Sequence, residues 1–306
     1  MNHHHHGVHK QNSSIQKNII FSIFLNTLIV AGEIIAGIFS NSFALISDAL
    51  HNFSDLLTLI LSLAAVRISS WKATPDKSYG YLRAEIIAAF INSSALVIIG
   101  AYIIYQASGR LFTAEKIIAP WVIIAASIAF LANGISTYLL SKNSKEDLNA
   151  KSAYLHLFYD SVNSLLVIIS GVAIYLFNWT ILDPLLSMMI GIFIIKSGWD
   201  VVLETVNILI EGTPKNIDMQ SVTAFITSFP EVKEIHHLHI WSLSSRMKAL
   251  SVLVVVSDQL VSQGYLIIDK IEKALKEKFD IDHPTIQLEA DLSHEQNGLI
   301  NISRNK

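Results

Sequence analysis

Six long apolar runs fill the first two thirds of the chain and restrict its fold more than any other feature. They cover residues 18–38, 43–67, 83–107, 118–140, 152–177 and 182–205. An α-helix needs about 20 apolar residues to cross the hydrocarbon core of a bilayer, and each run reaches that length. Only 15% of all residues are charged, whereas a soluble chain carries about 25%. The pattern predicts a polytopic α-helical membrane protein with six transmembrane helices.

Basic residues are distributed unequally between the two sets of connections. One side carries Lys10, Lys17, Arg67, Lys72, Lys77, Arg83, Lys142, Lys145 and Lys151, and the other carries Arg110 and Lys116. Because the Lys/Arg-rich side faces the cytoplasm, six spans place both termini there. With no long His-rich loop and no targeting sequence, the expected location is a bacterial inner membrane.

The composition changes near residue 210 and becomes that of a soluble domain. Helical patterns at 217–229 and 262–279 alternate with β-branched runs at 232–243, 248–257 and 284–290. The order αββαβ predicts a cytoplasmic α+β domain with a ferredoxin-like sheet. The expected divisions are a His-rich tail (1–17), the membrane domain (18–211), the cytoplasmic domain (212–292) and a disordered tail (293–306).

Three short observations concern possible ligands and partners. The run His3–His6 is either an expression tag or a native tail that collects metal. The chain has no cysteine, so a zinc site must use histidine, aspartate or glutamate. A net charge of −3 gives no reason to expect a nucleic-acid partner.

The apolar runs contain histidine–aspartate pairs where ionisable side chains are unexpected. His51 and Asp55 lie in the second run, and His156 and Asp160 repeat the H-x-x-x-D spacing in the fifth. Residues four apart share one face of a helix. Each ionisable residue at mid-membrane costs about 2.5–3.5 kcal/mol on insertion scales, so ordinary packing would not repay four of them.

A divalent cation would balance these four side chains. Two carboxylates neutralise its charge, and two imidazole nitrogens with two carboxylate oxygens form a tetrahedral set that suits Zn²⁺. The structural alternative is that these side chains hydrogen-bond between helices. Their repetition in two runs favours the metal site.

Three nearby polar residues are candidates for supporting roles. Asp48 lies about one turn before His51 and Asn52, and it either serves a proton path or hydrogen-bonds between helices. Glu33, in the first run, has the same two interpretations. Asn163 lies about one turn beyond Asp160 and could orient its carboxylate.

The chain resembles the cation diffusion facilitator family of divalent-metal/proton antiporters. The stretches that carry the resemblance are residues 41–51, 78–85, 182–184, 211–214, 238–241 and 285–289. The resemblance implies a homodimer whose membrane helices 2 and 5 bind the transported ion through His51, Asp55, His156 and Asp160. Histidine at the first ligand position favours Zn²⁺ over Cd²⁺, and the ligand set also fits Co²⁺.

The resemblance also implies a regulatory metal site in the cytoplasmic domain. It would use His236 with Glu289 and His283 or Asp282, at the dimer interface. Leu253 stands where relatives often carry a further histidine, which puts a two-metal cluster in doubt. Strand alternation predicts that His237 and His239 share one face and that His236 points away. The alternative is that these are simple surface histidines.

Two further expectations concern the membrane-proximal region. Arg83 and Glu211 match a salt bridge of the family that interlocks the dimer, and the alternative is a solvated pair worth under about 1 kcal/mol. The loop from Trp71 to Ser78 offers only Asp76 as a ligand, so no metal site is expected there.

The sequence thus predicts a secondary transporter, and not an enzyme, that exports Zn²⁺ from the cytoplasm in exchange for protons. Its partners are a second copy of the chain, the metal ion, protons and the lipid bilayer, with no organic cofactor. One rival is a non-transporting metal sensor or scaffold of the same family. The other is an intramembrane metalloenzyme, against which stands the absence of H-E-x-x-H after either metal-site histidine.

Overall fold

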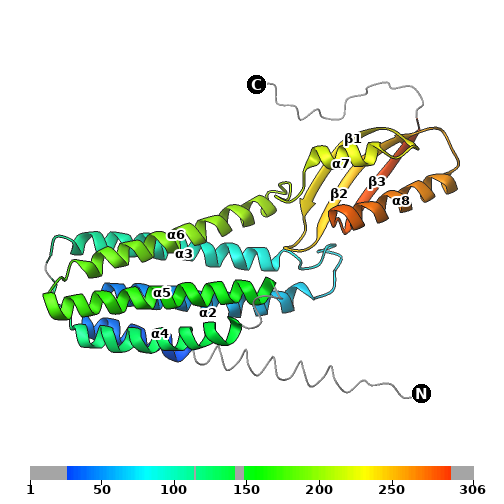
Figure 1. The fold of residues 1–306 in the computed structure, drawn as a ribbon. Coiled ribbons are helices and arrows are strands. Elements are labelled where there is room, and N and C mark those ends of the chain that lie inside the picture. Colours follow the sequence, from blue (N-terminus) through cyan, green and yellow to red (C-terminus); the bar gives the residue numbers. More distant parts are fainter. Residues whose placement is uncertain (1–25, 114, 142–147, 291–306) are drawn as a thin grey trace, which may run out of the picture. The chain divides into compact units, whose positions relative to one another are not determined.

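The structure is a computed structural model that describes residues 26–113, 115–141 and 148–290. The chain forms two compact units (Figure 1). The helical unit contains the described residues up to 67 together with 88–203. The sheet unit contains residues 68–87 and the described residues from 204 onward.

Long apolar helices build the helical unit. They are a helix at Asn26–Ser40, α2 (Phe43–Ser69), α3 (Ala84–Arg110), α4 (Ala119–Ser141), α5 (Leu148–Phe177) and α6 (Leu182–Leu209). The five helices α2 to α6 are long and apolar enough to cross a membrane. The predicted runs match these helices closely, although residues 18–25 of the first run lie outside the described residues.

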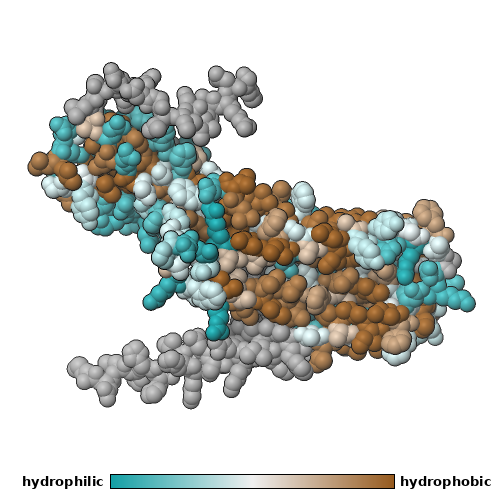
Figure 2. Space-filling view, turned by 180° about the vertical axis from the view of Figure 1, so that it is seen from behind, coloured by the Kyte–Doolittle hydropathy of each residue, from teal (hydrophilic) through white to brown (hydrophobic). Residues whose placement is uncertain are grey.

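The surface of the helical unit is apolar over a broad area (Figure 2). Large hydrophobic side chains such as Ile98, Tyr105 and Ile128 are exposed by more than half. A soluble protein rarely exposes apolar patches of this extent, whereas a lipid-facing surface requires them. The interior is filled by small or branched side chains that include Leu45, Ile103 and Val167.

Glycines allow α3 and α6 to pack backbone against backbone. A Cβ atom added at Gly100 would lie 2.9 Å from the carbonyl oxygen of Gly191, and one added at Gly191 would lie 3.1 Å from the carbonyl oxygen of Gly100. Small residues serve this purpose at helix interfaces inside membranes, where apolar burial provides no driving force. These two helices therefore form a tightly joined pair.

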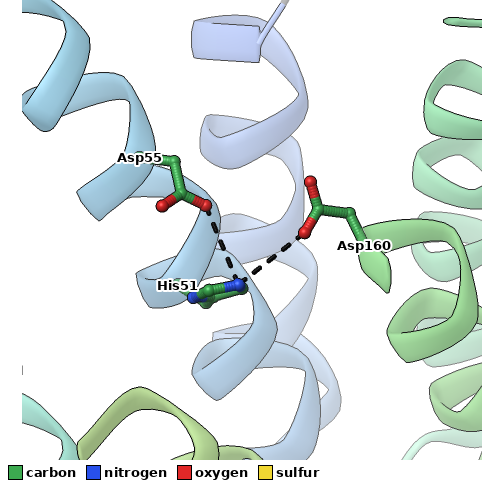
Figure 3. A group of neighbouring side chains, drawn as sticks. All are labelled: His51, Asp55 and Asp160. Carbon is green, nitrogen blue, oxygen red and sulfur yellow. Dashed lines mark ion pairs between the residues drawn. The ribbon is translucent and has the colours of Figure 1, made fainter. Parts of the chain in front are cut away.

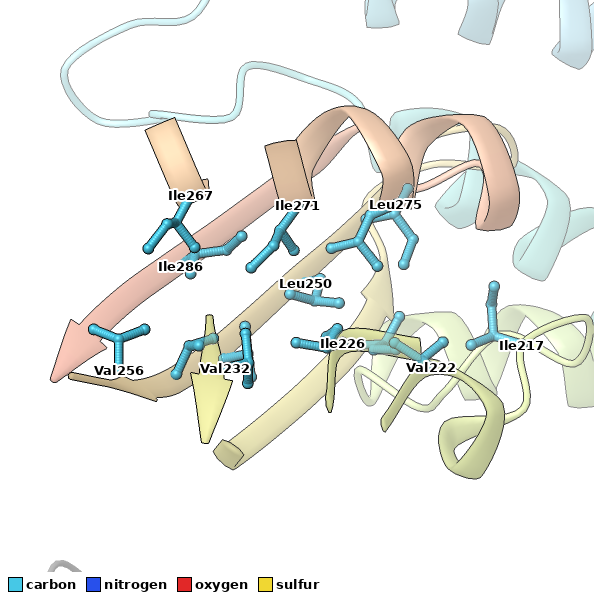
Figure 4. Close-up of a cluster of buried hydrophobic side chains, with 14 residues drawn as sticks. Ile217, Val222, Ile226, Val232, Leu250, Val256, Ile267, Ile271, Leu275 and Ile286 are labelled. Atoms are coloured by element: carbon cyan, nitrogen blue, oxygen red, sulfur yellow. The ribbon is translucent and has the colours of Figure 1, made fainter. Parts of the chain in front are cut away.

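The sheet unit has the predicted order αββαβ. Its elements are α7 (Met219–Thr227), β1 (Val232–Ser242), β2 (Lys248–Val256), α8 (Val261–Phe279) and β3 (His283–Ala290). The strands lie in the order β1-β2-β3, with β1 antiparallel and β3 parallel to β2. Side chains from both helices and all three strands form one core, which includes Val222, Leu250 and Ile271 (Figure 4).

The strand β1 corrects one expectation about the histidines. His236 pairs with Leu253 and His239 pairs with Ser251, so three steps on β1 match two on β2. Leu253 and Ser251 share one face of β2, and so His236 and His239 also share a face. Simple alternation is wrong here because a bulge interrupts the strand, where His237 has a φ of 50°.

Candidate metal centre

Helices α2 and α5 bring the four predicted metal ligands into one group. The Nε2 atom of His51 lies 3.7 Å from Oδ2 of Asp55 and 3.7 Å from Oδ1 of Asp160 (Figure 3). The Nε2 atom of His156 lies 3.4 Å from Oδ2 of Asp55 and 3.6 Å from Oδ2 of Asp160. Imidazoles and carboxylates therefore alternate around a ring, which we call the four-residue centre.

The pairing across the centre shows how the two helices run. His51 of α2 meets Asp160 of α5, and Asp55, one turn later, meets His156, one turn earlier. The two helices are therefore antiparallel where they form the centre. The H-x-x-x-D spacing then places an imidazole of each helix beside a carboxylate of the other.

The dimensions of the centre fit a small divalent cation. Tetrahedral coordination at the usual 2.0–2.2 Å would separate neighbouring ligand atoms by about 3.3–3.6 Å. The nitrogen–oxygen distances of 3.4–3.7 Å are close to that range. The ligand atoms of His51, Asp55 and Asp160 all lie within 4.8 Å of one another. His156 closes the ring through both carboxylates.

Two carboxylate oxygens of the centre have no hydrogen-bond partner among the described residues. Oδ2 of Asp55 and Oδ1 of Asp160 are buried and accept no hydrogen bond within the described part of the chain. Leaving a buried acceptor unsatisfied costs about 1–3 kcal/mol, and more when it is charged. A bound cation would satisfy both atoms, so the donor chemistry and the geometry agree.

Exposure increases across the centre along one direction. The side chains of Asp160 and His51 are 7% and 21% exposed, while those of Asp55 and His156 are 32% and 48% exposed. Asp55 lies closer than His51 to the end of α2, and His156 lies closer than Asp160 to the start of α5. The centre is therefore most accessible from the end of α2 that leads into the sheet unit.

A second polar layer lies one turn away, on the buried side of the centre. Asp48 accepts a hydrogen bond of 3.4 Å from Oγ of Ser164, and Glu33 accepts one of 3.1 Å from Nδ2 of Asn52. Asn163 is half-buried, and its neighbour Ser164 is the residue of α5 that reaches Asp48. Our sequence reasoning missed Ser164, although its spacing of four from Asp160 could have revealed it.

The start of α2 is capped by a residue of another helix. The carboxylate of Asp183, near the start of α6, accepts hydrogen bonds from the backbone N–H groups of Phe43 (2.8 Å) and Ala44 (3.3 Å) and from the hydroxyl of Ser42. These N–H groups have no partner within their own helix. No local pattern in the sequence indicates this cap, because Asp183 and Phe43 are 140 residues apart.

The predicted regulatory residues do not meet in the sheet unit. His236 lies on β1 and Glu289 on β3, so β2 separates them by two strand spacings, about 9.5 Å. His283 begins β3 opposite Ala249, at the other end of the register from the Val255–Glu289 pair, and its ring contacts Tyr79. The imidazole of His236 lies 3.5 Å from the carboxylate of Glu234.

Arg83 and Glu211 form an ion pair of 3.1 Å within one chain. Their side chains are 35% and 64% exposed. A pair in this environment is screened by solvent and typically contributes under about 1 kcal/mol. As it stands in the single chain, the contact has the character of a solvated pair.

Both units match models of known protein families. Residues 19–210 match the model described as "Cation efflux transmembrane domain", and residues 214–291 match "Cation efflux protein, cytoplasmic domain". Together these two models span most of the chain.

Characterised relatives agree over nearly the whole length. The chain is 36% identical to the "Cadmium, cobalt and zinc/H(+)-K(+) antiporter" of Bacillus subtilis, with 95% of each chain covered. It is 33% identical to the "Metal cation efflux system protein CzcD" of Cupriavidus metallidurans, covering 90% of this chain and 86% of that protein. It is 30% identical to the "Zinc transporter ZitB" of Pectobacterium atrosepticum, covering 94% and 89%. This chain is therefore a membrane transporter of metal cations, not an enzyme, and it belongs to the cation diffusion facilitator family.

Proposed function

We propose that this chain exports Zn²⁺ from the cytoplasm in exchange for protons by alternating access. The observation that carries the proposal is the ring of two imidazoles and two carboxylates, which contains buried oxygens without a hydrogen-bond partner in the described ranges of the chain. The names of the relatives add support, because they include zinc and proton exchange. Co²⁺ and Cd²⁺, which the Bacillus relative's name also includes, are further candidate substrates.

Competition between metal and protons would couple the two fluxes. Zn²⁺ requires ionised Asp55 and Asp160 and neutral His51 and His156, so binding releases any protons that these groups hold. Protonation would in turn expel the metal. If the centre faces the two sides of the membrane alternately, an inward proton gradient drives metal outward.

The direction of exposure supports loading from the cytoplasm. Asp55 and His156, the more exposed ligands, lie toward the end of α2, which continues into the sheet unit. That unit matches a cytoplasmic domain. We propose that both termini lie in the cytoplasm, because of the lysine and arginine distribution. We also propose that the chain resides in a bacterial inner membrane.

The remaining predictions are retained as parts of this proposal. We propose that the chain acts as a homodimer, which the family of its cytoplasmic domain supports, and that Arg83 and Glu211 contribute to its assembly. Asp48 is proposed to serve the proton path and Asn163 to support Asp160.

A regulatory metal bound by His236, His283 and Glu289 would need ligands to move or a second copy to contribute, because these residues do not meet in one chain. We propose that the chain divides into a His-rich tail (1–17), a membrane domain (18–211), a cytoplasmic domain (212–292) and a C-terminal tail (293–306).

Zinc flux in reconstituted vesicles tests the proposal directly. The full chain is placed in vesicles with an imposed pH gradient, and Zn²⁺ and proton movements are recorded together. Asp160→Asn removes one charged ligand and should abolish coupled flux. Its Zn²⁺ affinity should fall by about 100-fold or more, because losing even a group that only orients a ligand costs about 10–100-fold.

Asp200→Asn is the matched control, because it removes an exposed carboxylate from the same helical unit. It should transport Zn²⁺ like the parent. Equal flux in Asp160→Asn and the parent would refute the assignment of the centre. Zinc binding without any flux in the parent would instead favour the sensor or scaffold function.

A further inference from the structure

Two buried carboxylates lie beside the four-residue centre without belonging to it. Glu33, on the helix Asn26–Ser40, and Asp48, on α2, are each 1% exposed. Asn52 lies one turn after Asp48 on α2 and donates to Glu33, which places the Glu33 carboxyl group against that face of α2. Ser164 of α5 donates to Asp48. We call these two carboxylates and their partners the carboxylate layer.

Within the described residues, neither carboxylate has a basic partner in an ion pair of 4.0 Å or less. One oxygen of Glu33, Oε1, is buried and has no hydrogen-bond partner there. Burying an unpaired charge is costly, and ionisable groups inside a membrane protein therefore pair with or bind a counter-charge. The layer accordingly needs a positive charge that the surrounding side chains do not supply.

The ligand chemistry of the layer differs from that of the centre. Its polar groups are two carboxylates, the hydroxyl of Ser164 and the amide of Asn52, so oxygen atoms are the only strong acceptors. Oxygen ligands suit protons and hard cations, whereas imidazole nitrogen suits zinc. Imidazole enters only at the neighbouring centre, through His51 and His156.

The carboxylate layer lies on the buried side of the four-residue centre. Asp48 precedes His51 on α2, and Ser164 follows Asp160 by one turn on the antiparallel α5, so both steps point away from the exposed side of the centre. The charged groups of the centre that face the layer are His51 from α2 and Asp160 from α5. A cation arriving at either place must therefore affect the other.

We propose that Glu33 and Asp48 hold the monovalent cations that the transported metal displaces. This inference rests on the proposed exchange and specifies where the exchanged charge resides. When the centre is empty, a proton or a hard alkali-metal ion neutralises the layer. When a divalent cation enters the centre, one or two turns away, its charge repels that cation and promotes its release. The coupling then involves more than direct competition for the four ligands.

Calorimetry of the purified full chain in detergent tests the proposal. Zn²⁺ binding is measured at one pH in two buffers with different ionisation enthalpies, which gives the number of protons released per metal ion. The measurement is repeated with K⁺ replaced by N-methyl-D-glucamine. Glu33→Gln removes the negative charge and keeps an oxygen acceptor for the amide of Asn52. Glu115→Gln is the matched control, because Glu115 is an exposed glutamate that likewise accepts a hydrogen bond from an asparagine amide, that of Asn41.

Two results would support the layer as the cation site. If the occupant is a proton, Glu33→Gln should still bind Zn²⁺ but release about one proton fewer per ion than the parent and Glu115→Gln. If the occupant is an alkali-metal ion, K⁺ should weaken Zn²⁺ binding in the parent and lose this effect in Glu33→Gln. Asp48→Asn provides a second test of each outcome should Glu33→Gln not fold.

The proposal is overturned if the folded variants match the parent in both proton release and K⁺ dependence. That outcome differs from a failure of the proposed transport function. If the four-residue centre does not bind the metal, Asp160→Asn retains the zinc affinity of the parent, whatever the carboxylate layer does.

Discussion

Removing the carboxylate of Asp183 should loosen the start of α2, the helix that carries His51 and Asp55. In Asp183→Ala, the N–H groups of Phe43 and Ala44 lose acceptors at 2.8 and 3.3 Å. These groups have no alternative acceptor in the first turn of their helix. The negative charge that opposes the positive helix terminus is lost as well.

The expected magnitude follows from the cap. Loss of a side-chain cap costs about 1–2 kcal/mol, which corresponds to a change of about 5–30-fold in a local opening equilibrium. Hydrogen exchange followed by mass spectrometry on peptides from the start of α2 should therefore show amide exchange accelerated by about that factor. Zn²⁺ affinity should fall too, because His51 and Asp55 lie two to three turns further along the loosened helix.

The matched control is a second carboxylate cap, which belongs to the sheet unit. Asp218 caps α7 in the sheet unit through the backbone N–H of Ser221, at 2.9 Å. Asp218→Ala should accelerate exchange in α7 and leave α2 unchanged. If the α2 amides of a folded Asp183→Ala exchange at the parental rate, the carboxylate does not hold the start of this helix, and our reasoning is wrong.

Two further predictions concern packing and pH. Gly100→Ala should lower the free energy of unfolding in detergent by about 1–3 kcal/mol through overpacking, because its Cβ would lie 2.9 Å from the carbonyl oxygen of Gly191. Gly109→Ala should leave the free energy of unfolding nearly unchanged, because nothing lies within 4 Å of its Cβ. The hydroxyl and N–H groups of Ser221 lower the pKa of Asp218. The stabilisation of α7 by the ionised Asp218 is therefore fully present above the ordinary aspartate pKa and should be lost as the pH falls through the lowered pKa. Amide hydrogen exchange in α7, compared between the parent and Asp218→Ala across this pH range, measures the loss.

The helices could be predicted because their signals are local. The apolar run 43–67 became α2 at Phe43–Ser69, and the run 83–107 became α3 at Ala84–Arg110. Such runs need no knowledge of tertiary contacts, because length and polarity alone decide whether a helix can span a bilayer. The five elements of the sheet unit followed from periodicity in the same way.

The approach of the four proposed metal ligands was also accessible to sequence reasoning. The H-x-x-x-D spacing places His51 and Asp55 on one helix face, and the cost of burying charge implies a partner. What the spacing did not contain was the antiparallel pairing, in which His51 meets Asp160 and Asp55 meets His156. That pairing depends on the register between two helices separated by about 100 residues.

Features that depend on distant contacts or on local irregularity escaped prediction. Asp183 caps a helix that begins 140 residues earlier, and no local pattern announces it. The bulge at His237 reversed the assignment of faces along β1, because one additional residue shifts every later side chain. Motifs therefore indicated the candidate ligands, and the fold determined what surrounds them.

The surroundings matter because the centre alone does not balance the charge of this region. In the proposed site, a divalent cation would neutralise Asp55 and Asp160, but Glu33 and Asp48 remain buried in the adjacent layer. Substituting the four proposed ligands would therefore not remove every cation-dependent step. A transporter built this way needs positive charge in the layer in each state in which both carboxylates are ionised. The polar neighbours of the centre, and not only its ligands, must consequently be considered when the stoichiometry of exchange is interpreted.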